Sequence, residues 1–155
     1  STPLYSSAAS DVYKRQTLVT TCIAAAAGGV SAAIFSNILY KTYDLTMFMN
    51  GVLGGLVGIT AGADQMSPTD ATLIGVIAGI ILPLGVSLID KLKLDDPVGA
   101  IAVHLICGIW GTLAVGFFSN LEILDTGLTR WEQIKVQFIG VGSIGLFSFL
   151  KKNIL

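Results

Sequence analysis

Five apolar stretches, separated by short polar segments, follow one another along the chain. They cover residues 17–40, 45–63, 71–89, 97–121 and 134–150. Each stretch is too long for a strand in a protein core and lacks a period-two alternation, so the pattern predicts helices. About 20 predominantly apolar residues cross a bilayer as a helix. The sequence therefore predicts an all-α membrane protein, a polytopic bundle of about five transmembrane helices.

Composition supports a membrane environment. Of the 155 residues, 53% are hydrophobic and 12% are charged, whereas about 25% are charged in an ordinary soluble domain. A formal net charge of −1 argues against nucleic acid as a partner, which would require a basic surface. Cys22 and Cys107 both lie inside apolar runs, so we interpret them as packing residues and expect no disulfide framework or metal site.

Residues 1–16 differ from the rest of the chain because they are polar, rich in serine and without an apolar core. They do not have the form of a signal peptide. We expect them to be a non-native junction or the edge of a fragment, and we take residues 17–155 as the transmembrane domain.

Glycine recurs at four-residue spacing in the second stretch, residues 45–63. Three overlapping GxxxG pairs are formed by Gly51, Gly54, Gly55, Gly58 and Gly62. Small residues let helix backbones approach closely in lipid. We therefore expect this helix to lie inside the bundle, with neighbours on both sides.

The third stretch has a helix start and a break that can be read from its residues. Ser67, Pro68 and Asp70 form the pattern of a capping box with proline at the first helical position. Pro83 lies in the middle of the stretch and removes one hydrogen bond to the carbonyl of Gly79. We interpret Pro83 as a packing kink and expect a bend there.

The fourth stretch contains His104, which is the single histidine of the chain. Asp96 and Pro97 predict its start, with the carboxylate accepting from the N–H groups of Val98 and Gly99 and proline in the first helical position. His104 then lies roughly 10 Å into the helix. An ionisable residue at that depth usually faces a bundle interior or a pore.

The neighbours of His104 give two readings of its role. Gly108 and Gly111 follow it at i+4 and i+7, so an α-helix would place them on its face and leave room for a helix or a small ligand. His104 is then a pathway residue, or it is a histidine hydrogen-bonded between packed helices with no further role.

Basic residues predict the orientation. Lys41, Lys91, Lys93, Lys151 and Lys152 all follow odd-numbered stretches, so they fall on one side of the membrane. Because basic residues collect in cytoplasmic loops, we expect that side, and the carboxyl terminus with it, to be cytoplasmic.

Two of these stretches also resemble a known family. DDPVGAIAVHLICGIWGTLAVGFF (residues 95–118) and MNGVLGGLVGITAGAD (residues 49–64) resemble signature helices of the ammonium transporter and Rhesus family. The resemblance covers residues 18–155. It implies the second half, spans seven to eleven, of an eleven-helix fold built from two inverted repeats.

The resemblance further implies a function and a site. Members of this family carry ammonium or ammonia across the plasma (inner) membrane for nitrogen uptake, as homotrimers and without a cofactor, through a hydrophobic pore with two histidines. His104 matches the second histidine, Asn50 a position near the inner vestibule, and Asp96 an aspartate below the pore. Gly99 stands where some members carry an acid. The first histidine and the outer gate belong to the missing half, so we expect this chain not to transport alone.

Other classes of function remain to be compared. An ammonium sensor or a scaffold-type membrane protein of the same fold is the alternative to a transporter. An enzyme is not expected, because the spans offer one histidine and scattered hydroxyl and amide groups, with no metal cluster, nucleophile elbow or phosphate loop in the sequence.

Overall fold

The computed structural model describes the backbone of residues 4–154 and the side chains of residues 12–151. Within these residues every regular element is a helix, so the predicted all-α class is confirmed. The elements are α1 (Leu4–Tyr40), α2 (Leu45–Thr60), α3 (Pro68–Lys91), the π-helix η1 (Ala102–Ile106), α4 (Cys107–Phe118), the short α5 (Leu121–Leu124) and α6 (Arg130–Ile154).

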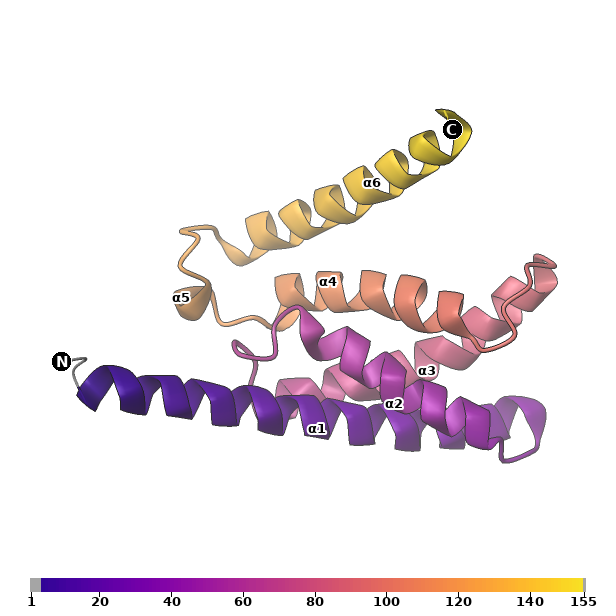
Figure 1. The fold of residues 1–155 in the computed structure, drawn as a ribbon, viewed down its shortest axis with the longest axis horizontal. Coiled ribbons are helices and arrows are strands. Elements are labelled where there is room, and N and C mark those ends of the chain that lie inside the picture. Colours follow the sequence, from indigo (N-terminus) through magenta and orange to yellow (C-terminus); the bar gives the residue numbers. More distant parts are fainter. Residues whose placement is uncertain (1–3, 155) are drawn as a thin grey trace.

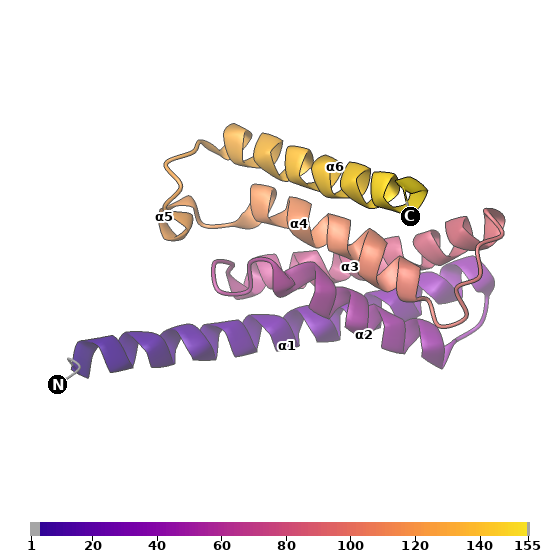
Figure 2. The same cartoon turned by 45° about the horizontal axis from the view of Figure 1, so that its top comes forward.

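The helices run back and forth along one direction (Figure 1). The loop after α1, the loop after α3 and the end of α6 lie at one end of the bundle, and the loops before α3 and before α6 lie at the other end (Figures 1 and 2). The first end carries Lys41, Lys91 and Lys93. The lysines that the sequence placed on one side therefore do share one end of the molecule.

Glycine allows α1, α2 and α3 to pack closely. A Cβ added to Gly55 or to Gly75 would collide with the carbonyl oxygen of Ala24, and one added to Gly79 would collide with the Oγ of Ser31. These are contacts between helix backbones, or between a backbone and a short side chain, as expected for helices that associate in lipid.

Helices α4 and α6 complete the arrangement. Trp110 of α4 donates from Nε1 to the carbonyl of Ile74 on α3 at 3.1 Å and packs edge-on against Phe118. Arg130, at the start of α6, donates to the carbonyl of Ser119 at 2.8 Å. The start of α6 packs against the end of α4, where Gly116 lies against Ile134. Helix α6 then diverges from α4 toward its own carboxyl terminus (Figure 1).

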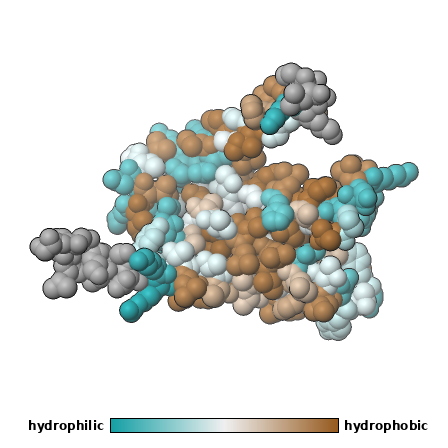
Figure 3. Space-filling view, in the orientation of Figure 1, coloured by the Kyte–Doolittle hydropathy of each residue, from teal (hydrophilic) through white to brown (hydrophobic). Residues whose placement is uncertain are grey.

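The surface has the polarity of a membrane protein. Hydrophobic residues cover the middle of the face shown in Figure 3, and hydrophilic residues gather toward both ends. Among the described residues, three helices are long and apolar enough to span a membrane, at Val12–Tyr40, Pro68–Lys91 and Arg130–Lys151. Two shorter apolar helices accompany them at Leu45–Thr60 and Ala102–Phe118. These five correspond in order to the five predicted stretches.

Helix α1 begins earlier than the sequence predicted. It starts at Leu4 and continues without a break into the first apolar stretch, so residues 4–16 are helical. Gln16 donates from Nε2 to the carbonyls of Asp64 (3.2 Å) and Met66 (3.3 Å) in the loop before α3. The polar composition that separates these residues from the stretch therefore does not end the helix. Their origin as a junction stays a prediction.

The start of α3 agrees with its sequence signal. Ser67 is the N-cap, Pro68 opens the helix, and the capping box between Ser67 and Asp70 is formed in both directions. Pro83 lies inside α3, and its carbonyl accepts from the hydroxyl of Tyr40 at 3.1 Å.

Candidate functional site

The chain enters its histidine-bearing helix through a turn rather than through the predicted cap. The N–H of Gly99 donates to the carbonyl of Asp96 at 3.1 Å, and Gly99 has a φ of 71°, a conformation that glycine adopts without strain. Pro97 therefore lies in the turn and not at the first helical position, because the chain reverses before the helix begins.

Asp96 caps the helix three residues later than expected. Its Oδ2 accepts from the N–H of Ile101 at 3.0 Å and from that of Ala102 at 3.4 Å, not from Val98 and Gly99. The turn carries the carboxylate up to the true helix start, where free N–H groups need an acceptor. The prediction that Asp96 is the capping acceptor is confirmed, and the prediction that Val98 and Gly99 are its donors is wrong.

His104 is the central residue of the π-helix η1, Ala102–Ile106. The N–H of Cys107 donates to the carbonyl of Ala102, which is the i→i+5 pattern of such a helix. π-turns are rare and occur often at functional sites. The wider turn carries one extra residue, so the faces of the helix after it are shifted by one position.

A groove of about 280 Å³ lies beside His104, between α4 and α6. It is lined by His104, Leu105, Gly108, Ile109, Thr112, Val141 and Ile144. The imidazole is exposed, and no hydrogen bond to it is formed within the described part of the chain. The groove is thus mostly apolar, with an imidazole and a hydroxyl group as its polar side chains.

Only one of the two glycines expected beside His104 lies there. Gly108 lines the groove, and a Cβ on it would meet just Val57 Cγ1, at 3.9 Å. Gly111 is buried against α2 instead, because a Cβ on it would lie 2.8 Å from the carbonyl oxygen of Gly58. Thr112 takes the place on the His104 face that an unbroken α-helix would have given to Gly111, since the π-turn adds a residue.

Asn50 lies in the second turn of α2 and is 8% exposed. Its Nδ2 donates to the carbonyl of Val98 at 3.0 Å, within the turn that precedes η1. Asn50 is absent from the residues that line the His104 groove. The structure therefore brings Asn50 to the helix start and not to the imidazole.

The glycines of α2 lie against three neighbouring helices. Gly51 and Gly55 face α1, Gly54 faces Cys107 of α4, and Gly58 faces both α3 and Trp110. Gly62 follows the end of α2 and lies against Met66 and Val115. Helix α2 thus has α1 on one side and α4 on the other.

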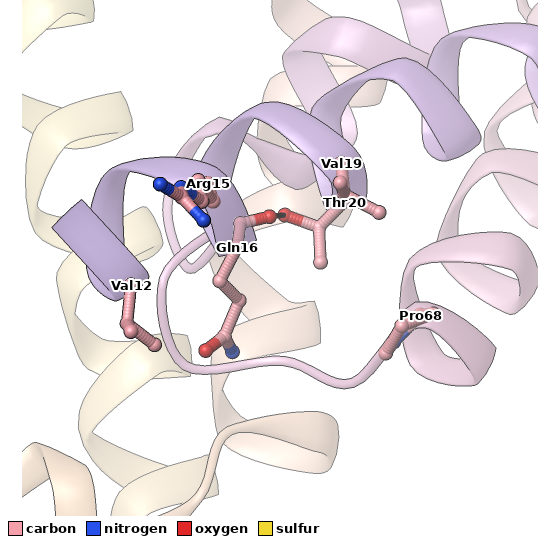
Figure 4. A pocket seen from close by; sticks show the side chains of 6 residues that line it. All are labelled: Val12, Arg15, Gln16, Val19, Thr20 and Pro68. Carbon is pink, nitrogen blue, oxygen red and sulfur yellow. Dashed lines mark hydrogen bonds between the residues drawn. The ribbon is translucent and has the colours of Figure 1, made fainter.

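A second hollow, of about 300 Å³, lies near the start of α3 and is lined by residues of α1 with Pro68 (Figure 4). Gln16 reaches toward the loop before α3 and is bonded to it, and Thr20 donates to the carbonyl of Gln16 at 3.0 Å. Two of the polar side chains that line this hollow, those of Gln16 and Thr20, are thus engaged with backbone groups. The groove at His104 is therefore the candidate functional site.

The fold and this groove define a polytopic helical membrane protein with an ionisable residue inside its membrane-spanning region. The sequence profile of the Ammonium Transporter Family matches residues 5–155, and the chain belongs to this family. The match begins earlier than position 18, where the expected resemblance started.

Individual relatives support the assignment to this family. The chain is 44% identical over 135 residues to a Synechocystis sp. protein whose name marks it as a candidate ammonium transporter, covering 85% of this chain and 28% of that protein. It is 42% identical over 127 residues to ammonium transporter Amt2 of Archaeoglobus fulgidus, covering 82% and 26%. The chain thus spans about a quarter of the length of these relatives.

Solved structures share the fold. A structure described as a sensor Amt protein has a TM-score of 0.80 and 35% identity, covering 93% of this chain and 38% of its own. Candida albicans Mep2 has a TM-score of 0.82 and 25% identity, covering 92% and 33%. The predicted family and the predicted partial helical fold are confirmed.

The sequence missed the π-turn and, with it, Thr112. Local spacing gives i+4 and i+7 partners for an unbroken α-helix, and nothing in residues 100–112 signals an extra residue in one turn.

Proposed function

We propose that this chain is the second half of an ammonium transporter and that His104 lines the route taken by the substrate. One observation carries the proposal: His104 is held at the centre of a π-turn and faces an open, mostly apolar groove. His104 therefore does not join the helices of this chain to one another, since a histidine with that role would be buried with a hydrogen-bond partner.

The chemistry of the groove suits ammonia better than ammonium. The apolar side chains of Leu105, Ile109 and Ile144 line it, and an unpaired charge is expensive in such surroundings. Ammonia is neutral and can exchange hydrogen bonds with an imidazole, which offers both a donor and an acceptor when neutral. Ammonium would therefore give up a proton as it enters, either to water at the mouth of the groove or to the free ring nitrogen of His104. The neutral imidazole would then hydrogen-bond ammonia, or the protonated imidazole would release a proton from its other nitrogen.

The exposure of His104 fits a site shared between two halves. In transporters built from inverted repeats, the substrate site lies where the repeats meet. The chain matches only about a quarter of its relatives, so the remainder of the protein would cover the groove and supply a second polar group to the imidazole. In the membrane we place the lysine-bearing end of the bundle, and the carboxyl terminus, in the cytoplasm, and we infer a homotrimer for the complete protein.

A sensor is the second candidate, and the solved structure described as a sensor Amt protein favours it. A sensor would bind ammonium at the same fold without net flux. The two functions differ in one measurable quantity, which is the amount of substrate carried across a sealed membrane.

Uptake of radiolabelled methylammonium into vesicles that contain the complete protein tests the proposal. We expect saturable uptake that unlabelled ammonium reduces, with vesicles lacking the protein as the control. Ammonium binding without uptake would contradict transport and support the sensor.

A further inference from the structure

We propose that Asn50 is a positioning residue, which anchors the turn before η1 and thereby sets the helical register that directs His104 into the groove. This inference rests on the proposed function of His104. It assigns Asn50 a role that acts through the imidazole, in place of a direct contact with the substrate.

The anchor is a specific, tight contact. The amide Nδ2 of Asn50 donates to the carbonyl of Val98 at 3.0 Å, and a Cβ on Gly99 would lie only 2.6 Å from the same nitrogen. The backbone of Gly99, with its φ of 71°, therefore brings the turn directly against Asn50. On the other side of the turn, Asp96 accepts from the first N–H groups of the helix, so the turn is held at both of its ends.

A second anchor lies beyond the π-turn. Cys107 is fully buried, and its Sγ would lie 3.1 Å from a Cβ on Gly54. Gly111 then meets the backbone of Gly58. Because Asn50, Gly54 and Gly58 follow one another at four-residue spacing, one stripe of α2 makes all of these contacts.

The number of residues between the two anchors differs between α2 and the segment that contains η1. Four positions separate Asn50 from Gly54 on α2, whereas eight separate Gly99 from Cys107. Gly99 lies in the turn and the helix begins at residue 100, so seven of these positions are helical and would rise about 10 Å as α-helix, against about 6 Å for the four positions on α2. The second segment must therefore be shortened, and a π-turn contributes because it takes one more residue per turn than an α-helix.

Loss of the Asn50 anchor would release this constraint. The turn at residues 97–99 could then move away from α2, and the extra residue could leave η1, which would become α-helical. Residues before Cys107 would rotate relative to those after it by up to about 100°, the angle of one residue in an α-helix. His104 would leave the face that it shares with Gly108 and Thr112.

Substitutions in the complete protein test the proposal. N50D keeps the shape of the side chain and removes the N–H donor, and N50L keeps a similar volume without polar atoms. N37L, on α1 at the same end of the bundle, is the control for replacing an asparagine. G99A adds a methyl group against Asn50, and G127A is its control, because Gly127 has a similar φ of 67° with nothing within 4 Å of its Cβ position.

Two measurements are needed. Methylammonium uptake per folded molecule, normalised by size-exclusion chromatography, should fall about fivefold or more in N50D and N50L, which lose the part-buried hydrogen bond to Val98. It should also fall in G99A, where the added methyl group pushes against Asn50 Nδ2. It should stay at the parent level in N37L and G127A. A residue needed only for stability would lower the amount of folded protein and leave uptake per folded molecule unchanged.

A structure of the N50L protein supplies the second measurement. We expect residues 102–106 to become α-helical and His104 to leave the groove. A retained π-turn with His104 in place would overturn the positioning role, whatever the uptake. If the parent protein carries no methylammonium, the transport function fails, and this structure still decides whether Asn50 sets the register.

Discussion

Gly108 and Gly111 are both glycines of α4, yet alanine should be tolerated at only one of them. A Cβ at Gly111 would lie 2.8 Å from the carbonyl oxygen of Gly58 and 2.9 Å from that of Val57. Both are backbone atoms, so α2 and α4 must separate to admit the methyl group. A Cβ at Gly108 would meet only Val57 Cγ1, at 3.9 Å, which is an ordinary contact.

The size of the difference follows from these contacts. Overpacking of this kind costs about 1–3 kcal/mol. The greater helix propensity of alanine, up to about 1 kcal/mol over glycine, applies to both positions and cancels in the comparison. We therefore expect G111A to be less stable than G108A by on the order of 1–3 kcal/mol.

Thermal denaturation of the complete protein in detergent, followed by size-exclusion chromatography, measures this difference. G111A should lose its folded peak at a temperature lower by about 2 °C or more, and G108A should behave like the parent protein. A G111A protein as stable as the parent would refute the register described for α4.

Three further predictions concern the cap, the topology and the isolated chain. D96A should destabilise the start of η1 by on the order of 1 kcal/mol or more, and D96N should be milder because its oxygen still accepts; equal damage to folded yield in both would mean that the charge matters and not the hydrogen bond. Cysteines at Ser67 and Thr126 should react with a membrane-impermeant reagent from outside and one at Lys93 only from inside, and labelling of Lys93 from outside would reverse the topology. Cells that express residues 1–155 alone should show no saturable methylammonium uptake, since an inverted-repeat site needs both halves; uptake by this chain would disprove the need for a second half.

The apolar stretches predicted the helices well because in lipid each backbone group must be satisfied within its own helix. The length and the polarity of each stretch are then enough to locate the spans. Local signals also predicted the capping box at Ser67, whose partners lie three residues apart. The start of α1 was missed because helices can continue through polar residues, and Gln16 is held by the distant loop at Met66.

The candidate site depended more on tertiary structure. His104 could be found because an ionisable residue stands out in an apolar span. Its surroundings could not, because local spacing assumes an unbroken α-helix, whereas the π-turn places Thr112 and not Gly111 on its face. Asn50 shows the same limit, since its partner, Val98, lies 48 positions further along the chain.

The role of His104 is tested most directly by methylammonium uptake and substrate-driven current in vesicles that contain the complete protein. The parent protein is compared with H104A, H104E and a control, I139A, whose side chain is 67% exposed on α6. H104A should give a normal folded yield with uptake strongly reduced or altered in its charge coupling, because a donor and acceptor on the route are lost. H104E should keep partial activity if its acid stays protonated, since that group also donates and accepts. Uptake and currents at the parent level in both His104 variants would show that His104 is a packing residue and would contradict the proposed route.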